Sequence, residues 1–256
     1  MPKLELNSVT LCAATSVNVE ATTEALRSSL DQVSFADCIL FTDRPVSGTH
    51  PGVRVVPIEP MRSSRDYSEF LLTSLVDHLM TEHCLVVQWD GFVADASQWD
   101  ERFLDFDYIG APWPQFDDGH DVGNGGFSLR SRKLLEACCA PGFTIGHPED
   151  VAICRTNRAF LEGEHGIRFA DRAIARRYAF ERSDTKQSAF GFHGIFNMIP
   201  VLGADRFWRI YETLDDKRSA FVDYRLLMRQ LGTSGDAAGR RLRLTKDRFF
   251  NRFRAS

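Results

Sequence analysis

The residues that could do chemistry begin with a carboxylate at the end of a short apolar run. Residues 85–88, Leu-Val-Val-Gln, are followed by Trp89, Asp90 and Gly91. An apolar run of this length that ends at a breaker is typical of a buried strand, and ligands of open α/β sheets bind beyond the carboxyl ends of such strands. There, Asp90 would suit a hard cation, Mg²⁺ or Mn²⁺, that holds phosphate oxygens. Asp-Gly is also ordinary turn chemistry, so this segment alone leaves both interpretations open.

A glycine-rich segment, Gly123-Asn124-Gly125-Gly126, is the second candidate. It lacks the spacing of a P-loop or of a dinucleotide-binding loop. Three glycines in four residues still indicate positive φ angles or a ligand that lies very close to the backbone. A tight hairpin without a ligand is the alternative.

Acidic residues and a histidine complete the candidates. Glu149 and Asp150 precede an apolar helical segment, where carboxylates commonly cap a helix; in a cleft, one of them could act as a general base. His193 lies between glycines and aromatic residues, and a neutral imidazole is a frequent ligand of divalent metals. A half-buried, hydrogen-bonded histidine is the structural alternative.

The elements that must position these residues follow from hydrophobic periodicity. Strand, helix, strand and strand near the N-terminus favour a parallel, right-handed α/β unit. We therefore expect an α/β fold with a mostly parallel central sheet flanked by helices, and a helix capped by Ser63 or Ser64. Strands are expected at 9–15, 36–43, 53–58, 85–88, 127–130 and 177–182, and helices at 19–30, 66–80, 97–103, 131–139, 151–162 and over most of 203–231.

Composition limits the class of protein. The 256 residues carry a net charge of −4, which argues against a dedicated nucleic-acid binder. The six cysteines form no CxxC pair and suggest a reducing compartment. We see neither a secretory leader nor a bilayer-spanning segment and expect a cytoplasmic protein. Residues 240–256 combine seven basic residues with three phenylalanines, which suits peripheral contact with the inner membrane face or a terminal helix docked on the domain.

The order of these segments resembles that of GT-A glycosyltransferases, in particular a bacterial GT-A-like family first catalogued as a domain of unknown function. The resemblance covers roughly residues 8–200, and its most specific part runs from Tyr108 to Arg130. The segments that carry it are Gln88-Trp89-Asp90-Gly91, Tyr108-Ile109-Gly110-Ala111-Pro112-Trp113, Val122-Gly123-Asn124-Gly125-Gly126-Phe127-Ser128-Leu129-Arg130, Glu149-Asp150 and Phe190-Gly191-Phe192-His193.

This resemblance implies a role for each candidate. Asp90 matches the last aspartate of the DxD motif, which binds a Mn²⁺ or Mg²⁺ ion on the donor diphosphate, and His193 matches the histidine that completes that metal site. Gln88 replaces the first aspartate of the motif, which removes a negative charge and leaves metal dependence open. Asp150 matches the catalytic base of inverting members. The resemblance further places Glu149 beside the base, Gly123, Asn124, Gly125 and Gly126 under the donor sugar, and Gln88, Trp89, Ala13, Ala14, Thr15, Ser16 and Asp43 at the nucleotide.

The resemblance implies transfer of a sugar from a nucleotide-sugar donor, UDP-linked in such families, to a glycan or lipid-linked glycan acceptor in surface polysaccharide synthesis. Two alternatives remain, a sugar nucleotidyltransferase and a catalytically inactive sugar-binding domain. We expect one GT-A-like domain over residues 1–202, with a helical extension over 203–256 packed on it.

Overall fold

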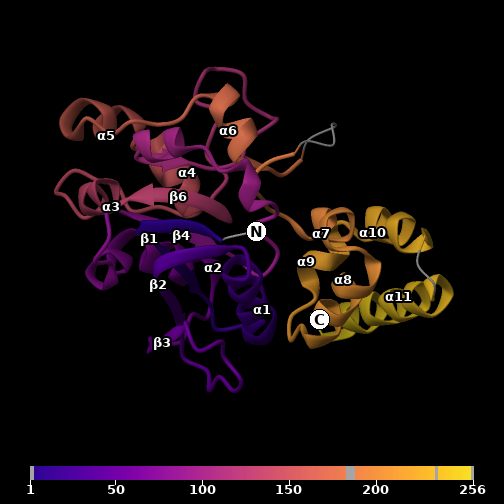
Figure 1. Cartoon of the computed structure of the whole chain (residues 1–256). Coiled ribbons are helices and arrows are strands. Elements are labelled where there is room, and N and C mark those ends of the chain that lie inside the picture. The colour runs from indigo at the N-terminus through magenta and orange to yellow at the C-terminus, as the bar shows by residue number, and fades with distance from the viewer. Residues whose placement is uncertain (1–2, 183–187, 234–235, 255–256) are drawn as a thin grey trace. The chain divides into compact units, whose positions relative to one another are not determined.

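The computed structural model describes residues 3–182, 188–233 and 236–254 (Figure 1). The chain divides into two compact units, Met1–His193 and Gly194–Ser256. The first unit holds the sheet and its helices, and the second is helical. The expected packing of the C-terminal extension on the first domain stays a prediction.

The central sheet of the first unit has six strands in the order β3-β2-β1-β4-β6-β5. β1, β2, β3 and β4 run parallel, whereas β6 is antiparallel to both β4 and β5. This mostly parallel sheet confirms the expected α/β class. The strands are β1 (Leu4–Ala14), β2 (Val33–Thr42), β3 (Arg54–Pro57), β4 (His83–Val87), β5 (Tyr108–Ile109) and β6 (Phe127–Ser131).

Both faces of β1 are buried from Val9 to Ala14, which explains why this part of the strand reads as a continuous, mostly apolar run. Val9, Leu11 and Ala13 belong to one hydrophobic cluster with residues of α1 (Val19–Leu30). Cys12 and Ala14 belong to a second cluster with residues of α2 (Ser64–Thr73) and of the 3₁₀ helix η1 (Leu75–His78). Since successive side chains of a strand point to opposite faces, the two clusters lie on the two sides of the sheet.

The remaining elements of the first unit confirm some expectations and correct others. Ser63 caps α2 in a capping box with Asp66, as predicted. The single helix expected at 151–162 is instead interrupted by a π-helical turn that ends at Asn157. The Asn157 N–H donates to the Ala152 carbonyl five residues back (3.0 Å), and its side chain bonds the Thr144 backbone and the same carbonyl. These elements are η2 (Ala96–Gln98), η3 (Glu101–Asp105), α3 (Arg132–Cys138), α4 (Glu149–Val151), the π-helical η4 (Ala152–Thr156), α5 (Arg158–His165), α6 (Arg172–Tyr178), β7 (Ala179–Phe180) and β8 (Gly191–Phe192).

The strand expected at 177–182 is shorter than predicted. Arg177 and Tyr178 form the last turn of α6, and only Ala179 and Phe180 are extended. They pair in parallel with β8 in a separate two-stranded sheet. This small sheet precedes His193 directly and therefore fixes where that histidine leaves the backbone.

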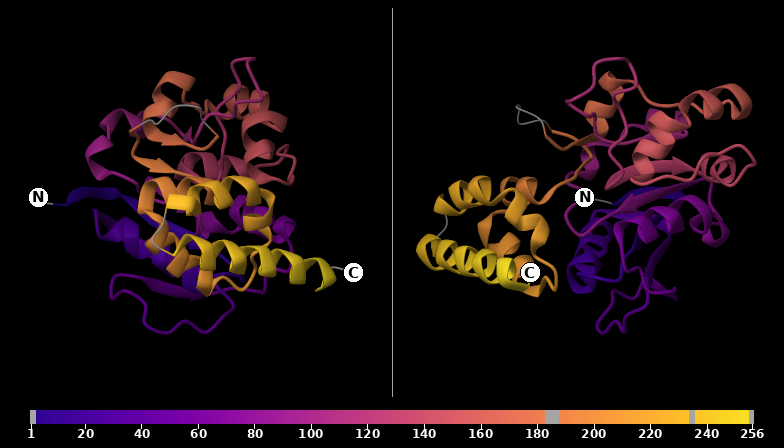
Figure 2. Two further views of the ribbon diagram at one scale, coloured as in Figure 1. Left: turned by 90° about the vertical axis from the view of Figure 1, so that its right-hand side faces the viewer. Right: turned by 180° about the vertical axis from the view of Figure 1, so that it is seen from behind.

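Every secondary-structure element among the described residues of the second unit is a helix, as expected for 203–231 (Figure 2). Its core includes Phe207, Tyr211, Leu227 and Leu244. No helix in the described part of the chain is both long enough and apolar enough to cross a bilayer. The elements are α7 (Ile195–Leu202), α8 (Ala204–Thr213), α9 (Arg218–Val222), α10 (Tyr224–Gln230), η5 (Leu231–Thr233) and α11 (Ala237–Arg254).

Candidate functional site

The predicted residues gather at one edge of the sheet. Loops that follow β1, β2 and β4 emerge there because these strands are parallel. β6 runs the other way, and Phe127 pairs with Val87, so residues 123–126 reach the same edge. The chain leaves β1 toward β2 on one side, and β4 lies on the other. This reversal of strand order is the place where open α/β sheets bind ligands.

The loops after β1 and β2 offer few side chains to a ligand. Ala13 and Ala14 are buried within β1 and contribute backbone at most. The Thr15 N–H donates to the Phe41 carbonyl (2.9 Å), and the Ser16 hydroxyl accepts from the Met61 N–H (2.8 Å).

Asp43 differs from its neighbours at this edge. Its side chain is 15% exposed and lies 3.6 Å from the Arg44 guanidinium through Oδ2. Oδ1 is buried and has no hydrogen-bond partner among the described residues. A buried acceptor without a partner is uncommon, and a hydroxyl or N–H of a ligand would satisfy it.

Asp90 lies in a tight turn that follows β4. Gln88 and Gly91 exchange backbone hydrogen bonds of 3.1 and 3.0 Å across the turn, with Trp89 and Asp90 at its tip. The turn that was the alternative interpretation of this Asp-Gly segment is therefore present. The turn places Asp90 Oδ1 3.6 Å from Nε2 of His193. Asp90 is thus buried beside an imidazole rather than extended into solvent.

His193 is held on both ring nitrogens. Nε2 lies 3.2 Å from Oε1 of Gln88, whose amide nitrogen donates to the Tyr67 hydroxyl (3.0 Å). Nδ1 lies 3.3 Å from Glu181. Burial lowers the pKa of His193, but the charges of Asp90 and Glu181 outweigh burial and leave that pKa above its ordinary value.

Two glycines make room for this imidazole. A Cβ on Gly126 would lie 2.1 Å from Nε2 of His193, and one on Gly91 would lie 2.8 Å from its Cδ2. Both distances are shorter than a non-bonded contact of a Cβ atom, so a side chain at either position would displace the imidazole. None of the glycines in the 123–126 loop has a positive φ angle. Close approach, by side chains of the protein itself, therefore explains these glycines.

Asp150 lies against the adjacent residue of the same loop. Its Oδ2 accepts from the Gly125 N–H (3.1 Å) and its Oδ1 from the Val151 N–H (2.8 Å). Burial, and then the charge of Glu149, raise the pKa of Asp150 to about 6. A carboxylate with this pKa is ionised near neutral pH and is more basic than an ordinary aspartate.

Glu149 has a different environment from its neighbour. Its Oε1 accepts from the Arg130 guanidinium (3.0 Å), and both side chains are buried, with 0% of Arg130 exposed. Ser68 donates to Oε2 (3.3 Å) and accepts from the Glu149 N–H (3.2 Å). This carboxylate thus neutralises a core arginine, and Arg130 also bonds the Gly125 carbonyl (3.4 Å).

Sequence reasoning assigned no role to Arg130, Glu181 or Tyr67. A charged residue in a strand with neighbours on both sides, as in Phe127-Ser128-Leu129-Arg130, signals a buried charge that needs a partner. Glu181 and Tyr67 carry no comparable local signal, because only the fold brings them to His193 and Gln88.

The Asp90–His193 pair could supply two of the ligands of a metal site. Two donors of one divalent cation lie about 3.0–3.4 Å apart when each bond is about 2.1 Å, and 3.6 Å is close to this range. A carboxylate on the far nitrogen of a ligating histidine is also usual, as Glu181 is here. Within residues 3–182, 188–233 and 236–254, however, no three His, Cys, Asp or Glu side chains are arranged to hold a metal. The amide oxygen of Gln88 would have to supply the third donor.

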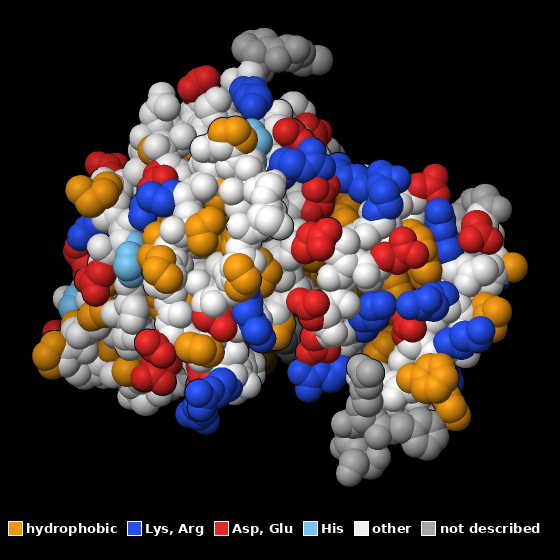
Figure 3. Space-filling model, turned by 90° about the horizontal axis from the view of Figure 1, so that it is seen from below, with side chains coloured by type: hydrophobic (Ala, Val, Ile, Leu, Met, Phe, Trp, Pro, Cys, Tyr) orange, Lys and Arg blue, Asp and Glu red, His pale blue; other side chains and the backbone are white. Residues whose placement is uncertain are grey.

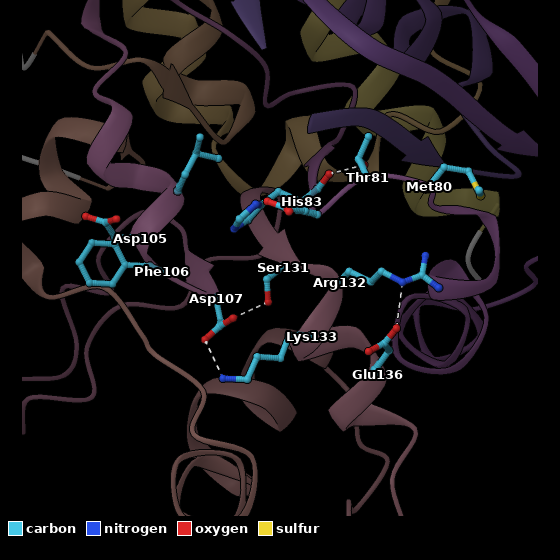
Figure 4. A pocket seen from close by; sticks show the side chains of 12 residues that line it. Met80, Thr81, His83, Asp105, Phe106, Asp107, Ser131, Arg132, Lys133 and Glu136 are labelled. Carbon is cyan, nitrogen blue, oxygen red and sulfur yellow. Dashed lines mark hydrogen bonds and ion pairs between the residues drawn. The ribbon is translucent and has the colours of Figure 1, made fainter. Parts of the chain in front are cut away.

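A cavity of about 580 Å³ lies at the other edge of the sheet (Figure 4). It is lined by residues at the amino end of β4, among them His83, and by Asp107, Arg132 and Lys133. Four of its charged side chains are paired with one another, since Asp107 contacts Lys133 as well as Ser131, and Arg132 contacts Glu136. None of the predicted residues line it, so we place the candidate site at the carboxyl edge instead.

Comparison with known proteins gives one family. No curated protein matches the chain. Among solved structures, an active-site mutant of LgtC matches with a TM-score of 0.41 and 10% identity, over 81% of this chain and 96% of that one. The family model described as "Protein of unknown function (DUF5672)" matches residues 51–193, which is more than half of the 256 residues. The chain belongs to the DUF5672 family.

Proposed function

We propose that this chain is a glycosyltransferase that moves a sugar from a nucleotide-sugar donor, UDP-linked by the resemblance to GT-A enzymes, to an acceptor hydroxyl. One observation carries the proposal. Gly126 contacts the imidazole paired with Asp90, and Gly125 binds the carboxylate of Asp150. The two glycines are neighbours in one loop, so the imidazole and the carboxylate lie along the same short stretch of backbone, and the charge of Asp150 acts on His193.

The first half of the site would bind the donor diphosphate. Asp90 and His193 would hold a Mn²⁺ or Mg²⁺ ion, with the Gln88 amide oxygen as a neutral third donor. A bound cation would stabilise the charge that develops on the leaving diphosphate. On the other side of β1, the unpartnered Oδ1 of Asp43 supports a role in binding the base or ribose.

The second half would activate the acceptor. Asp150 would accept the proton of the acceptor hydroxyl as its oxygen attacks the anomeric carbon from the face opposite the leaving group, which inverts the configuration. Its raised pKa supports this role, because a base works best with a pKa near the working pH. Glu149 would serve as a positioning residue, since Arg130 and Ser68 occupy its oxygens. The acceptor class, a glycan or lipid-linked glycan, follows from the resemblance alone.

A panel of nucleotide sugars, each with and without Mn²⁺, tests the proposal. We expect slow metal-dependent hydrolysis of one donor, and transfer when its acceptor is present. Release of pyrophosphate from a nucleoside triphosphate and a sugar phosphate would instead identify a sugar nucleotidyltransferase. Binding of a sugar without turnover of any donor would identify an inactive sugar-binding domain.

Two variants assign the residues. Asp150→Asn should reduce transfer by about 10²–10⁴-fold and leave donor affinity nearly unchanged. Asp90→Asn should instead weaken Mn²⁺-dependent binding of UDP in calorimetry. The control is Asp105→Asn, an exposed aspartate beside the cavity at the other edge of the sheet. Full transfer by Asp150→Asn would overturn the assignment of the base.

A further inference from the structure

The C-terminal helix α11 has a buried stripe that docks it within the second unit. Leu244 is fully buried, the Arg241 guanidinium donates to the Met228 carbonyl (2.7 Å), and Arg240 pairs with Asp205 (2.7 Å). These residues recur at helical spacing on one side of α11. These contacts, all on one side, hold the helix in place within the second unit.

The opposite side of α11 carries large apolar side chains exposed to solvent. Leu242 is 57%, Phe249 56% and Phe250 63% exposed. In the described part of the chain, no aromatic side chain other than Phe249 and Phe250 is exposed to this extent. Positions 242 and 249 are seven residues apart and lie on one helical face, with 250 next to them. We call Leu242, Arg243, Lys246, Phe249 and Phe250 the outer face of α11.

The charge of this outer face has one sign. Arg243 and Lys246 are exposed, and Asp247 is the only acidic residue between 237 and 254. Asp247 lies at the edge of the outer face: its Oδ2 contacts the Tyr211 hydroxyl (3.0 Å) and Lys217 (3.1 Å) within the unit, and its Oδ1 pairs with Arg243 (3.1 Å). The outer face thus combines aromatic rings with two cations, one of which is paired with this acid, and blue and orange side chains lie beside each other on the right of Figure 3.

We propose that the outer face of α11 binds an anionic lipid surface. A helix in the membrane interface buries its apolar face near the acyl chains while Lys and Arg meet acidic headgroups, which is the combination seen here. A nucleic acid would use the cations, but it would leave Leu242 and Phe250 in water, and the chain's net charge of −4 opposes it. This proposal does not depend on the proposed function, because lipid binding can be measured without substrate.

The test is co-sedimentation of the full chain with vesicles. We expect binding to vesicles of phosphatidylcholine and phosphatidylglycerol, weak binding to phosphatidylcholine alone, and release as salt is raised, because the Debye length falls from about 10 Å at 0.1 M to about 3 Å at 1 M. Phe249→Ala with Phe250→Ala should weaken binding by about tenfold. Lys246→Glu should weaken binding by a similar factor, about tenfold, on acidic vesicles only.

Matched controls make each outcome decisive. Met80→Ala removes a side chain that is 93% exposed in the first unit, and Arg65→Glu reverses an exposed charge there; both should bind vesicles like the parent. Circular dichroism should be unchanged in all variants, because the altered side chains are exposed. Equal binding to neutral vesicles, wild-type binding by Phe249→Ala with Phe250→Ala, or tighter binding to RNA than to acidic vesicles would overturn the proposal.

Discussion

Replacing Asp150 with asparagine should stabilise the folded chain at pH 8 and leave its stability nearly unchanged at pH 4.5. The pKa of Asp150 is about 6 in the folded state, against about 3.9 in an unfolded chain. The folded state therefore holds the proton more tightly. The contribution of Asp150 to stability is full below about pH 4 and is lost as the pH rises through about 6. A shift of about two pKa units corresponds to a loss of roughly 3 kcal/mol at pH 8.

Asparagine avoids this loss because it carries no charge. It also has one oxygen fewer than aspartate. Since Asp150 accepts from both Gly125 and Val151, the substitution removes one hydrogen bond, worth about 1 kcal/mol. The free energy of unfolding should then rise by roughly 2 kcal/mol at pH 8. At pH 4.5 the folded carboxyl is protonated but the unfolded one is mostly ionised, so the parent has lost about 1 kcal/mol. This loss and the missing hydrogen bond nearly cancel, and the free energy of unfolding should be almost the same in the parent and the variant.

Thermal unfolding followed by intrinsic fluorescence at the two pH values measures both numbers. For a chain of this size about 1 kcal/mol shifts the Tm by roughly 2–4 °C, so the Tm should rise clearly at pH 8 and stay almost unchanged at pH 4.5. Asp105→Asn, an exposed substitution, serves as the control and should leave the Tm unchanged at both. An Asp150→Asn shift of the same sign and size at pH 8 and pH 4.5 would refute the assignment of a raised pKa.

Two further substitutions test the packing around the site. Glu149→Gln should lower the free energy of unfolding by about 3–5 kcal/mol in urea denaturation, because it leaves the fully buried Arg130 without its charged partner; a loss below about 1 kcal/mol would show that water reaches the arginine. Gly126→Ala should abolish Mn²⁺-dependent UDP binding in calorimetry, since its Cβ would displace the imidazole of His193. Gly163→Ala, in α5 with open space at its Cβ, is the matched control and should bind UDP normally while gaining roughly 0.5–1 kcal/mol of stability.

The elements with strong local signals could be predicted from sequence. The helix at 19–30 matches α1 in both bounds, because its apolar residues recur at helical spacing. The parallel strands β1, β2 and β4 were recognisable since burial on both faces produces continuous apolar runs. Their carboxyl ends in turn predicted that the loops containing Asp43 and Asp90 would lie at one edge of the sheet.

Other features depend on contacts that a local pattern does not contain. The break at Asn157 arises because its amide reaches Thr144 across a loop, and no periodicity records that. The pairing of His193 with Gln88 joins residues 105 positions apart. Glu149 and Asp150 are neighbours of the same chemical type, so sequence could not tell which one meets Arg130 and which one faces the glycine loop. Their assigned roles remain predictions until the variants above are measured.

The antiparallel direction of β6 limits which insertions and deletions the chain can tolerate. Gly126 directly precedes β6, Arg130 follows it by four residues, and strand side chains alternate between faces. One residue added between Gly126 and Arg130 would leave either Gly126 away from His193 or Arg130 on the opposite face from Glu149. Differences in length that alter ligand choice must therefore arise in other connections, such as the exposed residues 117–120 before this loop. That segment, rather than the glycines, is where a library of loop lengths would retain the fold.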